Sequence, residues 1–387
     1  MPDHGKIVSE FKTPLYMFDI NVLSERVAYL NSKFSDNTAL VYAVKANSFI
    51  PKEIENDVAR FEICSKGEFD ICNKLGIDRG KMVISGVHKD RPSIEEMISL
   101  YDDVLKYTVE SLNQFELLKE LSAKYGRTLH LLIRLTSGNQ FGVNGEEFKQ
   151  IINDCPSNMI IDGIEYFSGT QKHSLKKIAR EIEKLSEFVT QVEQETGFVF
   201  DEIEYGPGAP VFYFQDESFD EDEYFDELNR QLSVFSNKKV YIELGRSIAA
   251  SCGTYFTSVV DMKTNKNGNF VILDGGINHL VYYGQTMAMR VPYFDVLPER
   301  QDESETYTLY GSLCTVNDII VKSINVRKLK PGDVFAFKNV GAYSATEGIS
   351  LFLSRDLPKV VLYNRDKSVI VVRDFTKTSD INYPNYL

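Results

Sequence analysis

The 387-residue chain contains few cysteines and few histidines, and neither type is spaced as a metal site. The cysteines are odd in number and include no CxxC pair. A disulfide framework or a structural zinc site is therefore not expected, and a reducing, cytoplasmic compartment is the simplest setting. The five histidines show no ligand spacing, so the sequence predicts no metal dependence. The five cysteines are Cys64, Cys72, Cys155, Cys252 and Cys314.

Long apolar runs are also missing. Residues 1–12 lack the apolar core of a signal peptide, and no run approaches membrane-spanning length. The net charge of −13 argues against nucleic acid or an anionic membrane as the main partner. Much of that charge lies in the acidic stretch 216–227, which we interpret as a solvated loop or helix face. The chain is long enough for two domains, or for one large barrel with an appendage.

Short apolar strands alternate with amphipathic helices in the first two thirds of the chain. Helical patterns occur at 111–125, 146–153, 175–196 and 221–235. Ser111 and Gln114 have the spacing of a capping box, and Gly126 is a plausible helix stop. The alternation predicts an α/β fold, a (β/α)8 TIM-like barrel, with a doubly wound open sheet as the competing topology. The eight expected strands lie at 39–45, 61–65, 82–85, 105–109, 130–135, 160–167, 202–205 and 240–244.

After residue 250 the pattern changes to short β-rich segments separated by turn signals. This predicts a C-terminal antiparallel β domain, a sandwich or barrel, that the early strand Pro14–Phe18 could join. The expected domains are 1–20 as an N-terminal strand joining the β domain, 21–249 as the barrel and 250–387 as the β domain. The expected strands of the β domain lie at 255–262, 270–273, 318–321, 334–337, 360–363 and 368–373.

Lys45 stands at the carboxyl end of the first expected barrel strand, in the segment Val41–Asn47. The scaffold can aim a lysine amine at a ligand from such a rim position. The amine can then form a Schiff base with an aldehyde cofactor if its surroundings favour the neutral form. The alternative is a lysine that merely extends its amine into solvent.

Two glycine motifs follow the last two barrel strands, where the active site of such a barrel lies. Gly206-Pro207-Gly208 follows one strand and Gly245-Arg246 the other. Glycines let backbone N–H groups converge on an anion, and an arginine adds charge-assisted hydrogen bonds, so the pair suits a phosphate. The alternative for Gly206–Gly208 is a simple tight turn. Glu243 lies beside this site and needs a cation, which a protonated pyridine nitrogen or Arg246 would supply.

Two motifs in the β-rich part carry reactive groups. Cys314 stands in a turn before a strand, and Tyr343 stands in the glycine turn Gly341–Ser344. A buried, inert cysteine and a packing tyrosine are the alternative interpretations.

These motifs occur in the order of a known family. From Pro14 onward the chain resembles the fold-type III pyridoxal-phosphate decarboxylases, the group that contains ornithine and diaminopimelate decarboxylases. The segments that carry the resemblance are Tyr42–Asn47, Cys64–Glu68, Gly169-Thr170-Gln171, Gly206–Gly208, Glu243–Arg246, Leu313-Cys314-Thr315 with Asp318, and Gly341-Ala342-Tyr343.

The resemblance implies a pyridoxal 5′-phosphate cofactor and a role for each motif. Lys45 would form the Schiff base, and Glu243 would pair with the protonated ring nitrogen. Cys314 would reach the site of a neighbouring subunit in a homodimer and return a proton after CO₂ leaves. Thr315 and Asp318 would lie at the substrate. The expected cofactor-binding residues are Lys45, Glu62, Arg134, Phe167, Thr170, Gly206, Gly208, Glu243, Gly245, Arg246 and Tyr343.

The chain also departs from the better-known relatives. Phe167 stands where they carry a histidine stacked on the cofactor ring, and it can stack without donating a proton. Thr315 stands where ornithine enzymes usually have Asp and diaminopimelate enzymes Glu, facing the distal amine of the substrate. The segment Ile277–Tyr283 lacks the arginine of diaminopimelate enzymes. Without that carboxylate, the distal ammonium of a diamino acid substrate has no negative charge to pair with at this position.

The Leu-Cys-Thr and Gly-Thr-Gln forms look more like a branch that acts in natural-product biosynthesis. It includes the butirosin-pathway enzyme for carrier-bound glutamate, siderophore enzymes and the decarboxylase part of microcin C maturation. We therefore expect α-decarboxylation of an amino acid whose far end is uncharged or conjugated to a carrier protein, peptide or nucleotide.

Three alternatives remain. A decarboxylase of free diaminopimelate, ornithine or lysine would use the same site. An amino-acid racemase of this fold pairs the ring nitrogen with arginine, and Glu243 argues against it. A non-catalytic decarboxylase-like binding protein can lose the cofactor motifs, whereas Lys45, Glu243 and Cys314 are all retained.

Overall fold

The computed structural model describes residues 2–101 and 104–385, and the chain divides into two compact units. The barrel unit comprises Val27–Pro210 and Asp220–Ile248. The sheet unit comprises the segment ending at Arg26, the loop Val211–Phe219, and the chain from Ala249 onward.

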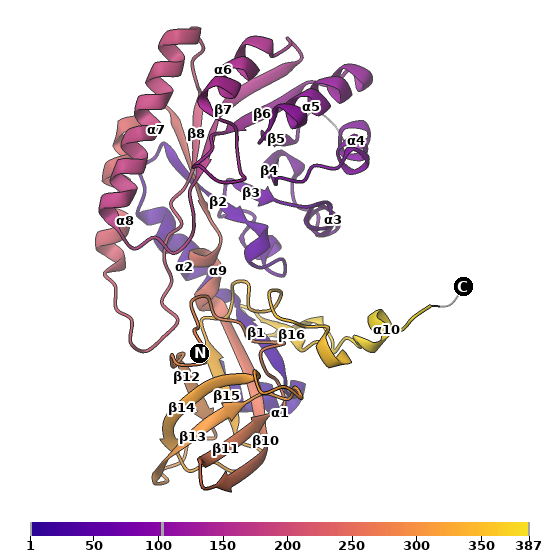
Figure 1. Cartoon of the computed structure of the whole chain (residues 1–387), viewed down its shortest axis with the longest axis vertical. Helices are drawn as coiled ribbons and strands as arrows, with labels where there is room; N and C mark the ends of the chain where they lie inside the picture. Colours follow the sequence, from indigo (N-terminus) through magenta and orange to yellow (C-terminus); the bar gives the residue numbers. More distant parts are fainter. Residues whose placement is uncertain (1, 102–103, 386–387) are drawn as a thin grey trace. The chain divides into compact units, whose positions relative to one another are not determined.

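The barrel unit contains a closed ring of eight parallel strands (Figure 1). Pairing of the last strand with the first closes the ring, so the (β/α)8 prediction is confirmed and the open sheet is wrong. All eight expected strands are present, with ends within two residues of the expected ones. They are β2 Thr38–Ala43, β3 Arg60–Ile63, β4 Met82–Ile84, β5 Lys106–Val109, β6 Leu129–Arg134, β7 Met159–Phe167, β8 Glu202–Gly206 and β9 Lys239–Leu244.

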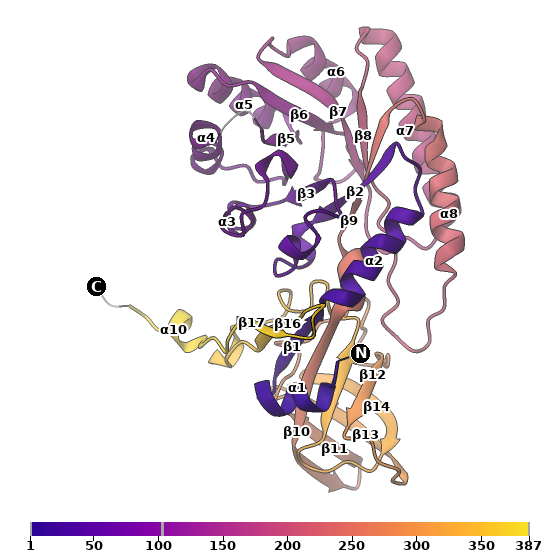
Figure 2. The ribbon, with the colours of Figure 1, turned by 180° about the vertical axis from the view of Figure 1, so that it is seen from behind.

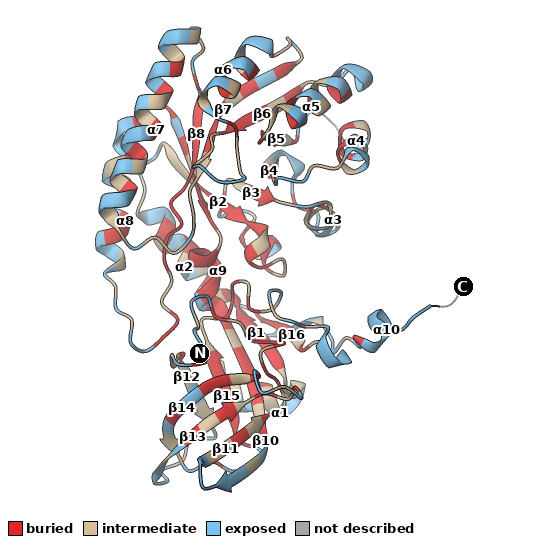
Figure 3. Cartoon of the chain, in the orientation of Figure 1, coloured by how far each residue is buried: buried red, intermediate tan, exposed pale blue. Residues whose placement is uncertain are grey.

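Helices surround the barrel strands with apolar faces inward and exposed faces outward (Figure 3). This is the amphipathic pattern that the spacing of their apolar residues predicts. No helix among the described residues has both the length and the apolar character of a membrane span. The helices of the barrel part are α2 Ile20–Ser32, α3 Lys66–Lys74, α4 Arg91–Leu100, α5 Leu112–Tyr125, α6 Gly145–Asp154, α7 Leu175–Thr196, α8 Glu221–Leu232 and α9 Arg246–Ala249.

Helix ends follow local sequence signals. The Ser111 side chain accepts a hydrogen bond from the Gln114 N–H, and Gly126 ends α5 in the left-handed region. The Gln114 side chain accepts from the Glu110 N–H, so the reciprocal capping box expected with Ser111 is only half present. Asp220, within the acidic stretch, caps the start of α8 by accepting from the Glu223 N–H. Part of that stretch is therefore a helix-starting signal.

The sheet unit contains a nine-stranded sheet in the order β14-β13-β11-β10-β1-β16-β17, with β15 pairing β10 and β12 (Figure 2). It is mostly antiparallel, but β1·β16 and β11·β13 are parallel pairs. Its helices are α1 His4–Phe11 and α10 Ser379–Asn382. Its strands are β1 Leu15–Asp19, β10 Gly253–Asn265, β11 Gly268–Leu273, β12 Phe294–Leu297, β13 Ser304–Tyr310, β14 Ile319–Arg327, β15 Val334–Lys338, β16 Lys359–Tyr363 and β17 Val369–Arg373.

Strand β1 is buried along its whole length between β10 and β16, so the early strand does belong to the sheet unit. The helix α1 and the strands β12 and β13 were not expected. β12 is only four residues long, and β13 begins with polar and acidic residues rather than an apolar run. The loop Val211–Phe219 also joins this unit, because its backbone bonds to the segment at Val291–Tyr293.

Charged side chains are buried among the barrel strands. At the amino ends of the strands, Arg60 contacts Glu202 at 2.7 Å and Glu204 at 3.4 Å, while Lys106 binds Glu202 and Asp162. Buried charges are tolerated in proteins when they are paired in this way. A second group of charges occupies the carboxyl ends of the strands, where the expected site lies.

Candidate active site

Lys45 lies just beyond the carboxyl end of β2, in the short 3-10 turn Val44–Ala46. Its side chain is 36% exposed. The Nζ atom lies 2.7 Å from Glu62 Oε2 on β3 and 3.5 Å from Glu243 Oε1 on β9. The chain thus holds one amine between two carboxyl groups from neighbouring parts of the barrel, in a position that remains accessible.

Glu62 and Glu243 are 2% and 6% exposed and hydrogen bond to each other. Burial and the charge of Glu62 raise the pKa of Glu243 well above its usual range. Burial works against ionisation of Glu62 as well, but the Lys45 ammonium and the bond with Glu243 lower its pKa. Glu62 is therefore the anion of the pair and Glu243 holds the proton. A cation placed against Glu243 would reverse that preference.

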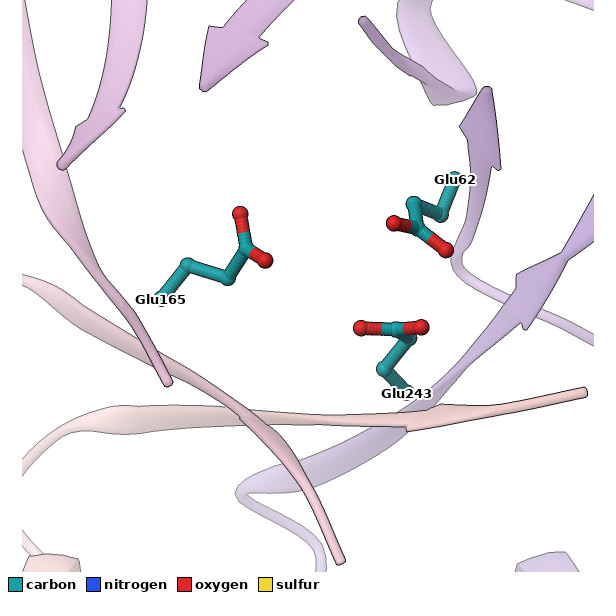
Figure 4. Close-up of side chains that lie close together, drawn as sticks. All are labelled: Glu62, Glu165 and Glu243. Atoms are coloured by element: carbon teal, nitrogen blue, oxygen red, sulfur yellow. The ribbon is translucent and has the colours of Figure 1, made fainter. Parts of the chain in front are cut away.

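A third buried carboxyl group, Glu165, points toward the same centre from β7 (Figure 4). Oxygens of Glu62, Glu165 and Glu243 lie within 4.8 Å of one another, a spacing that could also hold a cation. Burial, opposed by Arg134, raises the pKa of Glu165 to about 8. Glu165 was not among the residues predicted from the sequence. Its position two residues before Phe167 on one strand could have revealed it, because such residues share a face.

Arg134, at the end of β6, divides its charge between two carboxyl groups. Its Nη1 atom lies 3.3 Å from Glu165 Oε1 and 3.3 Å from Glu110 Oε2. The guanidinium also lies 4.7 Å from the ring centroid of Phe141. The structure thus brings the predicted residues Lys45, Glu62, Arg134 and Glu243 into one network, with Glu165 as the added member.

The glycine motif after β8 packs against the end of β7. A Cβ atom at Gly206 would collide with the Phe167 ring, and one at Gly208 would collide with the Gly169 carbonyl. Gly208 also has φ +61°, and its carbonyl accepts from the Lys172 N–H at 2.9 Å. Lys45 Nζ lies 5.9 Å from the Phe167 ring centroid. Phe167 therefore faces both the amine and the glycine motif, and Thr170 is exposed on the adjoining loop.

Gly245 and Arg246 follow β9 directly, and Arg246 is largely buried. β8 and β9 are neighbours in the barrel, so the two motifs extend from adjacent strand ends. Loops after the seventh and eighth strands are the usual phosphate site of such barrels. The residues present fit a phosphate next to an aldehyde-reactive amine.

Cys314 is exposed in the loop that precedes β14 of the sheet unit. Asp318 holds that loop from within, because its two carboxylate oxygens accept from the Ile277 N–H at 2.9 Å and the Leu313 N–H at 2.7 Å. The side chain of Thr315 accepts from the Asn317 N–H. Asp318 is 1% exposed, so its contacts are those of a loop-shaping residue, and a substrate contact stays a prediction.

Tyr343 adopts φ +65°, a backbone conformation that is an outlier for a bulky residue. Its carbonyl accepts from the Thr346 and Glu347 N–H groups, which fixes the turn. Gly341 permits this turn because a Cβ atom there would collide with the Ala249 carbonyl. Such strain is often retained at ligand sites.

A closed barrel with an amine between two carboxyl groups and two glycine motifs at adjacent strand ends fits a phosphorylated aldehyde cofactor. A family model described as "pyridoxal-dependent decarboxylase, C-terminal sheet domain" matches residues 16–341. The chain belongs to the pyridoxal-dependent decarboxylases, which are carbon–carbon lyases that use pyridoxal 5′-phosphate.

Curated relatives cover nearly the whole chain. L-glutamyl-[BtrI acyl-carrier protein] decarboxylase of Niallia circulans is 25% identical over 97% of this chain and 94% of its own. Diaminopimelate decarboxylase of Vibrio cholerae is 26% identical over 94% of this chain and 91% of its own. The structure of Helicobacter pylori diaminopimelate decarboxylase with L-lysine has the same fold, with a TM-score of 0.86, 24% identity and 98% of both chains covered.

The tight packing of Gly208 leads to a first prediction. Gly208→Ala should weaken binding of pyridoxal phosphate and lower the free energy of unfolding by about 1–2 kcal/mol for the left-handed backbone. The collision with Gly169 should add about 1–3 kcal/mol. Urea unfolding and cofactor titration measure the two effects.

Gly197→Ala is the matched control. Gly197 has φ +72° at the end of α7, and no described heavy atom lies within 4 Å of a Cβ atom there. Gly197→Ala should lower the free energy of unfolding only by the cost of the left-handed backbone, and its affinity for pyridoxal phosphate should stay that of wild type. Equal losses in the two variants would contradict the packing argument.

Proposed function

We propose that this chain removes the α-carboxylate of an amino acid whose far end is uncharged or is conjugated to a carrier protein, peptide or nucleotide. The position of the Lys45 amine between Glu62 and Glu243 is the observation that carries the decarboxylase chemistry. Thr315, next to the exposed Cys314, supports the substrate class, since it offers no carboxylate to a distal ammonium. The relative from Niallia circulans, named for a carrier-protein conjugate, supports it further.

The second candidate is decarboxylation of a free diamino acid. Several relatives at a similar level of identity are named diaminopimelate decarboxylase. The absence of a carboxylate at position 315 and of an arginine in Ile277–Tyr283 argues against it. A racemase or a non-catalytic binding protein fits less well, because Glu243 and Lys45 are both retained and face each other at 3.5 Å.

The chain supplies binding and orientation for the cofactor. Pyridoxal phosphate, when bound, provides the electron sink that accepts the electrons left by CO₂ loss. Gly206, Gly208, Gly245 and Arg246 would hold its phosphate, and the role of Tyr343 at the phosphate stays a prediction from the sequence. Phe167 presents an aromatic face on the Lys45 side of the site, where it can stack but cannot donate a proton.

Glu243 would give its proton to the ring nitrogen and remain as the paired anion. Its raised pKa makes it a ready proton donor, and the new cation then stabilises the charge that burial disfavours. Glu62 stays ionised and holds the Lys45 Nζ at 2.7 Å when that amine is charged. Glu62 would thus pair with the Lys45 amine, and Glu243 would pair with the ring nitrogen.

Cys314 would return a proton to the α-carbon after CO₂ leaves. The S–H bond breaks, the proton passes to carbon, and the thiolate regains a proton from solvent. Its exposure supports this role, because an exposed thiol on a fixed loop can enter the site of a partner subunit. The proposal therefore includes a homodimer with shared sites. A cytoplasmic location and the lack of nucleic-acid and membrane partners remain predictions from the sequence.

Lys45 provides the direct test of cofactor attachment. Wild-type protein reduced with borohydride should carry the cofactor mass on Lys45, and Lys45→Ala should carry none, since it lacks the amine that bonds to the aldehyde. Peptide mass spectrometry measures both. Cofactor mass fixed in Lys45→Ala would contradict the assignment.

Mixed dimers test the shared site. Lys45→Ala and Cys314→Ala should each be inactive, and mixing them should restore roughly a quarter of wild-type activity, because random exchange makes half the dimers hybrids with one intact site each. Activity is followed as CO₂ release, with subunit exchange confirmed by mass-tagged chains. No recovery after confirmed exchange would remove Cys314 from a partner's site.

A substrate panel separates the two candidates. CO₂ release should be fastest for conjugated substrates such as glutamyl carrier-protein or aminocarboxypropyl-bearing nucleotides or peptides, and slower for ornithine, lysine and diaminopimelate. Thr315→Glu should raise kcat/KM for a diamino acid by about tenfold or more, the worth of a charged hydrogen bond. Preference of the wild type for a free diamino acid would favour the second candidate.

A further inference from the structure

Three buried carboxyl groups at the carboxyl ends of the barrel strands face too few cations for all of them to be ionised. Glu62, Glu165 and Glu243 lie within 4.8 Å of one another. The cations beside them are Lys45, at 2.7 Å from Glu62, and Arg134, at 3.3 Å from Glu165. A third cation, Lys89, also acts on Glu165 but lies 3.9 Å from a fourth buried carboxyl group, Glu110. Buried like charges at such spacing cannot all be carried, so at least one carboxyl group keeps a proton.

Glu165 shares its nearest cation with another carboxyl group. Arg134 Nη1 lies equally far, at 3.3 Å, from Glu110 and Glu165, so its charge is shared. Neither oxygen of Glu165 has a hydrogen-bond partner within the part of the chain that the structure describes. Both are buried, and the side chain points toward Glu62 and Glu243 (Figure 4). A neutral carboxyl group with an unused O–H is therefore aimed at the site.

We propose that Glu165 is a positioning residue that acts through Glu243: it stays protonated and donates its O–H to the ionised Glu243 carboxylate. This inference rests on the proposed function, in which Glu243 becomes an anion against the ring nitrogen. Glu243 then gains free acceptor sites, and Glu165 is the neutral donor next to them. Rotation about the side-chain torsions of Glu165 would bring the O–H from its present position to hydrogen-bond distance.

A neutral Glu165 also leaves a single carboxylate, Glu243, for the ring nitrogen. An ionised Glu165 would place a third negative charge beside Glu62 and Glu243 and would compete for the same cation. Its pKa of about 8 keeps it protonated at neutral pH. The charged or titratable groups that face it from the surrounding elements are Lys45, Glu62, Lys89, Glu110, Arg134, Glu204 and Glu243.

Two substitutions of Glu165 separate hydrogen bonding from packing. Glu165→Gln keeps a neutral donor of the same shape, and its dissociation constant for pyridoxal phosphate at pH 7 should stay within about threefold of wild type. Glu165→Leu removes the donor, and its dissociation constant should rise about tenfold to a hundredfold, the worth of a hydrogen bond to a charged group. Cofactor affinity that is kept in Glu165→Gln and lost in Glu165→Leu would show that the hydrogen-bond donor matters, because a purely structural role does not predict this difference.

Glu204→Gln and Glu204→Leu are the matched controls. Glu204 is as buried as Glu165, and burial raises its pKa to about 8 as well, but its charged partner is Arg60 and it is not one of the three clustered carboxyl groups. Both control variants should bind the cofactor as wild type does. A loss in Glu204→Leu equal to that in Glu165→Leu would overturn the proposal.

The protonation of Glu165 is tested in the apoprotein by urea unfolding from pH 5 to pH 9. The folded-state pKa is raised, so the stability that goes with the bound proton is present at low pH and is lost as pH rises toward 8. Glu165→Gln has no such proton to lose. Its urea midpoint relative to wild type should therefore rise between pH 5 and pH 8, and a constant difference would overturn the neutral Glu165.

Binding of the cofactor to wild-type protein distinguishes a failure of the proposed function from a failure of the role of Glu165. Wild-type protein that binds no pyridoxal phosphate would overturn the proposed function. Wild-type protein that binds it, while Glu165→Leu binds it equally well, would overturn the role of Glu165 alone.

Discussion

The contact between the Lys45 ammonium and the buried Glu62 carboxylate is the interaction on which the rest of the site depends. It fixes one carboxyl group as the anion, which leaves its neighbour Glu243 with the proton. The barrel makes this possible because β2, β3 and β9 are consecutive around the closed ring. A reactive amine and a proton-holding acid therefore arise from one arrangement of charges.

The fold could be predicted from the sequence because its signals are local. Each barrel strand has its own apolar run, and turn residues such as Gly126 end helices where expected. Lys45, Glu62, Arg134 and Glu243 were predicted as site residues and do lie together. These four share strand ends, and the carboxyl ends of parallel barrel strands converge on one place.

Other features depend on packing that the sequence does not display. Glu165 becomes significant only when β3, β7 and β9 turn their carboxyl groups inward together. In the sequence, Asp318 resembles an ordinary polar loop residue. In the structure it accepts from the N–H group of Leu313 in its own loop and from that of Ile277, which is distant in sequence. Strand β13 alternates polar and apolar residues too weakly to be recognised alone, and its pairing with β11 and β14 defines it.

The position of β1 has a consequence for how the chain is made. This strand is synthesised before the barrel, but its two neighbours, β10 and β16, are synthesised after it. The barrel unit needs only residues up to Ile248. The barrel strands can pair before the partners of β1 have been synthesised. The barrel would therefore fold before the sheet. A truncated chain that ends before β16 would expose a buried edge and invite aggregation.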